Sequence, residues 1–123
     1  MSGKKTVLIV DDDASVGDAL RIILLDRDYR AIVVSNGHDA LKKAVSESFD
    51  VAIIDVGLPD MSGLELLSVL RTRDAALRII IMTALPSPEV LSEATRLGAM
   101  SVLAKPFPLS DVIALIKTPN EQL

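Results

Sequence analysis

Acidic side chains follow two apolar runs of this sequence at the point where each run ends. Three consecutive aspartates at 11–13 come directly after the run 7–10, and Asp55 directly follows the run 51–54. Runs of about four aliphatic residues predict buried strands, and parallel strands end at the same edge of a sheet, so we expect these carboxylates to gather. Two carboxylates about 4 Å apart in a partly buried site repel by roughly 4 kcal/mol. Such a cluster either binds a cation or raises a pKa, and it predicts a metal site.

Two other polar residues also end apolar runs. Thr83 closes the run 79–82, and Lys105 closes the run 101–104. In open α/β sheets the ligand site lies outside the carboxyl ends of the strands, at the point where the strand order reverses. In a sheet of order 2-1-3-4-5 this point separates the first and third strands. These are the two strands that carry the aspartates.

Five short apolar runs alternate with five amphipathic stretches, a pattern typical of repeated βαβ units. It predicts an α/β fold, a (βα)5 three-layer doubly wound parallel sheet of the flavodoxin-like type with strand order 2-1-3-4-5. The predicted strands are Thr6–Val10, Ala31–Val34, Val51–Ile54, Ile79–Met82 and Ser101–Ala104.

Helical periodicity and end signals define the helices between these strands. One apolar face is predicted in the first helix, and a second in the helix that follows Asn36-Gly37. A capping box at Ser62 and Glu65 starts the third helix, which is expected to end near Arg73. The fourth is expected between Ser87-Pro88 and Gly98, and the last over 110–117. The predicted core faces consist of Val16, Ala19, Leu20, Ile23 and Leu24, and of Leu41, Ala44 and Val45.

Composition limits the function classes. The 123 residues predict one domain over 1–118 and a C-terminal tail or linker stub over 119–123. With 13 basic and 17 acidic side chains, the net charge of −4 gives no general attraction to nucleic acid or to an anionic membrane. The chain has no cysteine, which excludes thiol catalysis and thiolate metal sites, and we expect a cytoplasmic protein. No apolar run is long enough to predict a membrane span or a signal peptide.

The residues at the strand ends, together with several loop motifs, resemble the receiver domains of two-component response regulators, which include the chemotaxis receiver. The resemblance covers nearly the whole chain, and its strength lies in the order of the motifs. They are Val10-Asp11-Asp12-Asp13, Asn36-Gly37, Ala40-Leu41, Asp55, Leu58-Pro59-Asp60-Met61-Ser62-Gly63, Thr83-Ala84, Gly98-Ala99 and Lys105-Pro106-Phe107.

The resemblance implies a role for each strand-end residue. Asp55 corresponds to the phosphoacceptor, which takes a phosphoryl group from a phosphohistidine of a sensor histidine kinase or phosphotransfer protein. Asp12 corresponds to a direct Mg²⁺ ligand, Asp11 to one acting through a water, and Gly57 to a backbone carbonyl ligand; Asp55 completes the metal set. Carboxylates and phosphate oxygens are the ligands that Mg²⁺ prefers.

The two remaining strand-end residues are expected to stabilise the phosphoryl group. Lys105 would supply a fixed cation and Thr83 a hydroxyl donor, since phosphoryl transfer needs positioning and charge neutralisation. The Lys105-Pro106 bond is expected to be cis, as in the family. Such a chain is not an enzyme acting on a separate substrate; it assists its own phosphorylation and dephosphorylation.

Other polar residues near these motifs have structural interpretations. Asp13 precedes a helix and is interpreted as its cap. Pro59 and Asp60 fit a turn before a capped helix. His38, the only histidine, has no second ligand nearby in the sequence and is expected on the solvated surface.

The sequence departs from the family at three places. Gly57 replaces a larger side chain two residues after the acceptor, and the apolar Leu85 stands two residues after Thr83; both affect how long the phosphorylated state lasts. Val102 stands where the family usually has the Tyr or Phe that turns inward with the threonine. A rotating-ring switch is therefore excluded, and we expect a weaker or backbone-led switch on the face made by the fourth helix, the fifth strand and the fifth helix.

Two alternatives remain open. The first is a pseudo-receiver, a binding module of the same fold that signals without phosphate, which the changes at Gly57 and Val102 favour. The second is a phosphatase with an aspartate nucleophile, which Gly57 disfavours because such enzymes commonly carry a second acid two residues after the nucleophile. Expected partners are the kinase or phosphotransfer protein and a possible effector domain or second copy at the switch face.

Overall fold

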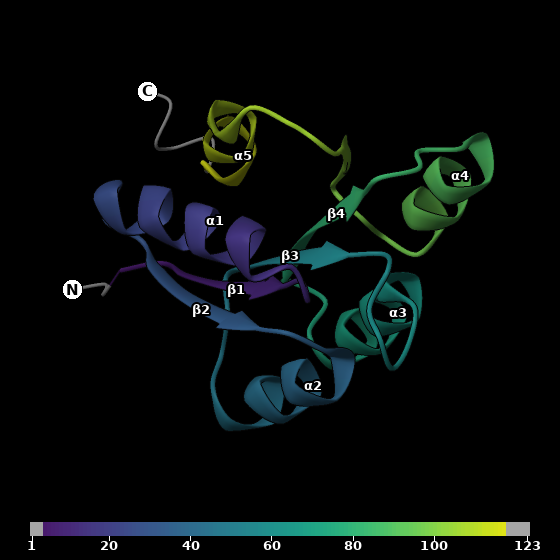
Figure 1. Ribbon diagram of the computed structural model, residues 1–123. Coiled ribbons are helices and arrows are strands. Elements are labelled where there is room, and N and C mark those ends of the chain that lie inside the picture. Colours follow the sequence, from purple (N-terminus) through teal and green to yellow (C-terminus); the bar gives the residue numbers. More distant parts are fainter. Residues whose placement is uncertain (1–3, 118–123) are drawn as a thin grey trace.

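The computed structural model describes residues 4–117, and the expected tail or linker stub over 119–123 lies outside this range. Ten elements alternate strictly between strand and helix (Figure 1). They are β1 (Thr6–Val10), α1 (Ala14–Asp26), β2 (Arg30–Val34), α2 (Gly37–Ser46), β3 (Val51–Asp55), α3 (Gly63–Arg73), β4 (Arg78–Thr83), α4 (Pro88–Arg96), β5 (Ser101–Ala104) and α5 (Leu109–Ile116).

The five strands form one parallel sheet of order β2-β1-β3-β4-β5, which confirms the predicted fold class. Strands β1 and β3 are neighbours, with Val10 opposite Ile54. Three predicted strands are one or two residues too short, because polar residues at their ends belong to the strands: Arg30 begins β2, Arg78 begins β4, and Asp55 and Thr83 end β3 and β4. The backbone of Asp55 and Thr83 is therefore held in place by the sheet.

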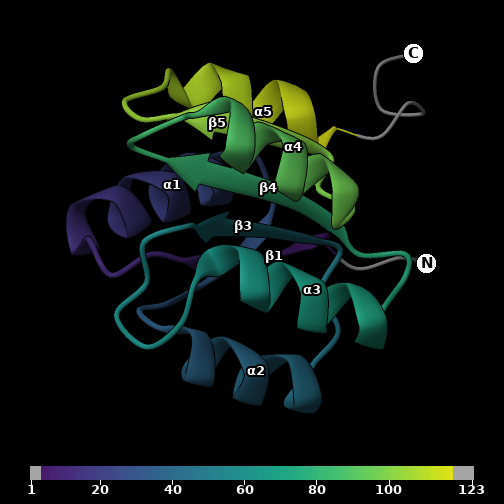
Figure 2. The ribbon, with the colours of Figure 1, turned by 90° about the vertical axis from the view of Figure 1, so that its right-hand side faces the viewer.

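Side chains that alternate along the strands fill two separate cores, one on each face of the sheet. Leu8, Ile54 and Ile81 pack with helices α2, α3 and α4. Ile9, Ile53 and Ile80 pack with α1 and α5. Figures 1 and 2 show α1 and α5 on the opposite side of the sheet from α2 and α3. The central strands are buried on both sides, which explains their almost uninterrupted aliphatic sequence.

The helix ends follow the predicted capping signals. Ser62 and Glu65 form the capping box of α3, and the Ser87 side chain caps α4 by accepting a hydrogen bond from the Val90 N–H. Gly98 has a φ of 101°, the left-handed conformation that ends the helix, as its position predicts.

The predicted core face of the second helix was partly wrong. Leu41 and Ala44 pack against the core, but Val45 is 68% exposed. The face of this helix that contacts the core includes Ala40, which is fully buried, and a residue five positions later lies about 140° around the helix axis from it. The apolar character of Val45 therefore does not indicate burial.

Candidate phosphoacceptor and metal site

The predicted site residues converge at the carboxyl ends of β1, β3, β4 and β5. One carboxylate oxygen from each of Asp11, Asp12 and Asp55 lies within 4.8 Å of the other two. Asp11 and Asp55 are buried, at 2% and 8% exposed, whereas Asp12 is exposed. The pairing of β1 with β3 brings Asp55 to Asp11 and Asp12, which lie 44 and 43 positions earlier in the sequence.

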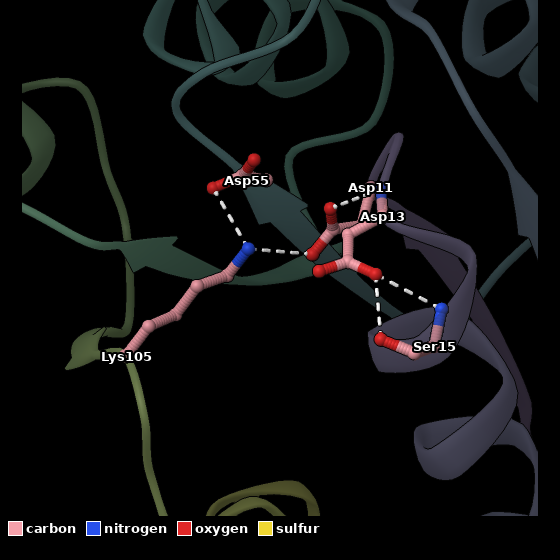
Figure 3. A network of polar contacts seen from close by, with 5 residues as sticks. All are labelled: Asp11, Asp13, Ser15, Asp55 and Lys105. Carbon is pink, nitrogen blue, oxygen red and sulfur yellow. Dashed lines mark hydrogen bonds and ion pairs between the residues drawn. The ribbon is translucent and has the colours of Figure 1, made fainter.

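Lys105 lies between two of these acids (Figure 3). Its Nζ is 2.8 Å from Asp11 Oδ2 and 3.4 Å from Asp55 Oδ1. Burial of the ammonium lowers the pKa of Lys105, but the hydrogen bond and charge of Asp11, together with Asp55, outweigh this and raise the pKa. Lys105 is therefore a fixed cation at the site. The Lys105–Pro106 bond that follows is cis, as expected.

The carboxyl group of Asp55 holds its proton more tightly than an ordinary aspartate. Burial raises its pKa, and the negative charge of Asp11 raises it further, while Lys105 and the Gly57 N–H act in the opposite direction. A positive charge placed near this carboxylate would stabilise its ionised form. The acids thus fit a divalent cation, since a hard cation accepts oxygen ligands and would relieve their mutual repulsion.

Thr83 ends β4 and is 4% exposed. Its Oγ1 accepts a hydrogen bond of 3.1 Å from the Leu85 N–H in the loop that leads to α4. The hydroxyl proton remains available as a donor. Beside Thr83, Asp55 and Lys105 an open groove of about 670 Å³ extends along this loop.

The neighbouring aspartate at 13 has the capping role predicted from the sequence. Its Oδ1 accepts hydrogen bonds from the Ser15 N–H at 3.0 Å and the Ser15 hydroxyl at 2.6 Å (Figure 3). The bonds from Ser15 lower the pKa of Asp13. His38 is exposed, also as expected. Val102 is half-buried against the core on the α4 side of the sheet, at the position where the family usually carries a ring.

One structural role was missed in the sequence. Asp60, interpreted as a turn residue, accepts hydrogen bonds of 2.8 Å from the backbone N–H groups of Gly37 and His38. These bonds connect the loop after β3 to the start of α2. No local signal predicts them, because the donors lie 22 and 23 residues away in the sequence.

The fold and the site define a class of protein: a doubly wound α/β domain with an acidic cluster, a lysine and a hydroxyl at the carboxyl edge of its sheet. A family model for the response regulator receiver domain matches residues 7–117. The chain belongs to this family.

Individual relatives agree with the family assignment. Sporulation initiation phosphotransferase F of Bacillus subtilis is 32% identical over 111 residues, which are 90% of each chain. A CheY-like receiver domain structure from Methanospirillum hungatei is 31% identical with a TM-score of 0.90, covering 93% of this chain and 91% of that one. A Burkholderia pseudomallei response regulator, solved with a phosphorylated aspartate and a calcium ion, has a TM-score of 0.87 and 29% identity, covering 97% of this chain and 70% of that one.

Other relatives are much longer proteins. The chain spans about a quarter (24%) of the length of the transcriptional regulatory protein ZraR of Salmonella typhimurium, to which it is 36% identical over 85% of its own length. Within residues 4–117, no helix has the length and apolar character needed to cross a membrane.

Proposed function

We propose that this chain is a phosphorylatable switch that accepts a phosphoryl group on Asp55 from a phosphohistidine of a sensor kinase or phosphotransfer protein. The observation that carries the proposal is the placement of Asp55, buried at the end of β3 beside Asp11 and Lys105 and open to the groove along the β4–α4 loop. A relative solved with a phosphorylated aspartate supports it.

In the proposed transfer, an Asp55 carboxylate oxygen bonds to phosphorus as the nitrogen–phosphorus bond of the phosphohistidine breaks. The electron pair of that bond stays on the imidazole, and the product is an acyl phosphate. Lys105 balances negative charge on the phosphoryl oxygens, and the Thr83 hydroxyl donates a hydrogen bond to one of them. In dephosphorylation a water oxygen bonds to phosphorus as the bond between phosphorus and the Asp55 oxygen breaks, which regenerates the carboxylate and releases inorganic phosphate with the water's protons shared between phosphate and solvent. The chain thus assists its own chemistry and does not turn over a separate substrate.

Asp11, Asp12 and Asp55 would hold Mg²⁺ together with the backbone carbonyl of Gly57. The close approach of the three carboxylates and the raised pKa of Asp55 support this assignment. When bound, the ion would offset the repulsion between these carboxylates and the incoming phosphoryl oxygens.

The output of the switch is a change in the face formed by α4, β5 and α5. The Thr83 hydroxyl accepts the hydrogen bond from the Leu85 N–H, so a move of the hydroxyl toward a phosphoryl group would release the loop 84–87 that leads to α4. Val102 supplies no ring to follow this move. The proposed switch is therefore carried by the backbone of the loop, and its partner is an effector domain or a second copy of the chain.

The test is the intact mass of the protein after incubation with phosphoramidate or acetyl phosphate, with Mg²⁺ and with a chelator. We expect one phosphate adduct that requires Mg²⁺ and disappears in Asp55→Ala. The matched control is Asp13→Asn, which removes a neighbouring carboxylate outside the acidic cluster and should keep the adduct. Absence of an adduct under every condition would reject phosphorylation and favour the phosphate-independent binding module suggested by Val102.

A further inference from the structure

The loop between β3 and α3 contains Gly57, whose backbone carbonyl is a proposed Mg²⁺ ligand. Gly57 has no side chain that could pack against its neighbours and hold this carbonyl in place. An ideal Cβ at Gly57 would have only Asp55 Oδ2 within 4 Å, at 3.8 Å. Packing at Gly57 therefore does not fix its orientation. The position of the carbonyl must depend on how the rest of the loop is held.

Backbone hydrogen bonds close the base of this loop. The N–H groups of Leu58 and Gly63 both donate to the Val56 carbonyl, at 3.1 and 2.9 Å. Gly57 and Ser62 form an isolated antiparallel bridge. Residues 57–62 thus form a small closed hairpin with its tip at residues 58–61, so a displacement of the tip would also displace Gly57.

Asp60 fastens the tip to the first turn of α2. Its Oδ1 accepts from the Gly37 N–H and its Oδ2 from the His38 N–H, both at 2.8 Å. The N-cap Asn36 satisfies the next donor, the Asp39 N–H, at 2.8 Å. One carboxylate thereby satisfies two of the otherwise unpaired donors at the helix start. The bonds from Gly37 and His38 lower the pKa of Asp60, so the carboxylate is ionised at neutral pH.

A second contact holds the same two segments together. An ideal Cβ at Gly37 would lie 2.5 Å from both Cγ and Sδ of Met61, so Met61 packs directly on the glycine at the helix start. The hydrogen bonds of Asp60 and the packing of Met61 are independent observations of the same junction. Both place the tip of the loop against α2.

We propose that Asp60 is a positioning residue of the metal site: by fastening residues 57–62 to the start of α2, it sets the position of the Gly57 carbonyl. The inference rests on the proposed function, because it requires Mg²⁺ at Asp11, Asp12, Asp55 and Gly57. Mg²⁺ demands ligands near 2.0–2.1 Å in close to octahedral geometry, so a small displacement of one ligand weakens binding. Partners that orient metal ligands typically change metal affinity by about 10–100-fold when removed.

The experiment measures Mg²⁺ binding and folding stability separately in Asp60→Ala, Asp60→Asn and the control Asp39→Ala. Asp39 is also an acid in the first turn of α2, and its carboxylate accepts a hydrogen bond from the side chain of Asn36 within the same helix start. Mg²⁺ alone is titrated into each protein and followed by the amide resonances of residues 12 and 57, and Tm is recorded by circular dichroism.

We expect Asp60→Ala to raise the Mg²⁺ Kd by about tenfold or more. Asp60→Asn, which keeps one acceptor oxygen, should fall between Asp60→Ala and the wild type and provides the test if the alanine variant does not fold. Asp39→Ala should lower Tm while leaving the Kd within about twofold. Equal Kd values for the wild type and both Asp60 variants would overturn the positioning role and leave the proposed function intact. A wild type that shows no saturable Mg²⁺ binding would overturn both.

Discussion

Lys105 is closer to Asp11 than to Asp55, the proposed phosphoacceptor. Its Nζ lies 2.8 Å from Asp11 Oδ2 and 3.4 Å from Asp55 Oδ1. The Asp11 side chain is fully buried in this pair, whereas that of Lys105 is 19% exposed. The lysine therefore faces a buried acid of the proposed metal site as well as the proposed acceptor, so we expect both the stability and the proposed chemistry of the site to depend on the same ammonium group.

Replacing Lys105 by Met should destabilise the protein by about 1–3 kcal/mol, because Asp11 loses a charged hydrogen-bond partner in a buried setting. Methionine retains an apolar stem, so the change removes mainly charge. The free energy of unfolding is measured by urea titration, with a chelator and then with Mg²⁺. We expect Mg²⁺ to recover part of the loss, since a cation can replace the missing charge.

The control for this change is Lys42→Met, which removes an exposed lysine on α2 and should alter the free energy of unfolding by less than about 0.5 kcal/mol. If the two lysine variants were equally stable, the pair between Lys105 and Asp11 would contribute nothing to folding.

Asp55→Asn should stabilise the metal-free protein at neutral pH, because the pKa of Asp55 is raised by burial and by the charge of Asp11. The folded state then binds the proton of Asp55 more tightly than the unfolded state does. Wild-type stability consequently falls as pH rises from the unfolded pKa through the folded pKa, and it stays lower above that range. The gain in Tm should be present at pH 7 and vanish near pH 3, where both states carry neutral Asp55.

Asp13→Asn should change the stability at neutral pH in the opposite direction from Asp55→Asn, although the two residues are close together. The hydrogen bonds from Ser15 lower the pKa of Asp13, so its ionised form stabilises the folded state above the unfolded pKa. The variant should have a lower Tm than the wild type at pH 7, and the difference should shrink as pH falls through the folded pKa. Shifts of the same sign for Asp13→Asn and Asp55→Asn at pH 7 would contradict the environments assigned to these two groups.

Local sequence signals were sufficient to predict the sheet and most of the polar residues at its carboxyl edge. An apolar run followed by Asp55, Thr83 or Lys105 predicts both a strand and the residue near which it ends. Because the strands are parallel, these ends lie at the same edge of the sheet. The capping role of Asp13 followed from its place before a helix. In each case the signal and the structure it predicts lie within a few residues of one another.

Contacts between distant segments could not be predicted in this way. Asp60 follows a proline, as is ordinary in a turn. Its bonds to Gly37 and His38 exist only because α2 and the loop after β3 lie side by side. Arg71 is similar: its guanidinium donates to carbonyls at 74, 75 and 77 and to that of Gly98. An arginine on an amphipathic helix gives no indication of such a role.

Gly57 in the loop after β3 and Gly63 at the start of α3 should differ in how much they tolerate alanine. A Cβ at Gly63 would collide with the backbone carbonyl oxygen of Asp55 and would lie 2.9 Å from Val56 Cα. Neither neighbour is a flexible side chain, so α3 or the end of β3 must shift, at a cost of about 1–3 kcal/mol. We expect Gly63→Ala to lower the free energy of unfolding by this amount and to slow formation of the phosphate adduct.

Gly57→Ala is the matched control, because the nearest atom to its added Cβ is Asp55 Oδ2 at 3.8 Å, an ordinary contact. Its unfolding free energy should stay within about 0.5 kcal/mol of the wild type. A stable Gly63→Ala with normal adduct formation would show that the start of α3 does not need its close approach to Asp55.

Removal of the Thr83 hydroxyl should separate phosphorylation from its structural consequence. In the wild type, a phosphate mimic such as beryllofluoride is expected to draw the hydroxyl away from the Leu85 N–H and to shift the amide resonances of residues 84–87 and of α4. Thr83→Val keeps the branched shape and the strand position but cannot donate to the mimic. It should still bind the mimic at Asp55, with the shifts in α4 largely lost, whereas Thr83→Ser should retain them.

Comparing Thr83→Val with Thr83→Ser separates the effect of the hydroxyl group from the effect of the size of the side chain. Since Val102 offers no ring to couple β5 to Thr83, the loop 84–87 is the expected route to α4, and its resonances should change together with those of the helix. Amide shifts in α4 that were equally large in Thr83→Val and the wild type would show that the Thr83 hydroxyl does not carry the switch. No shift in α4 of the wild type, with the mimic bound at Asp55, would place the output on another face of the domain.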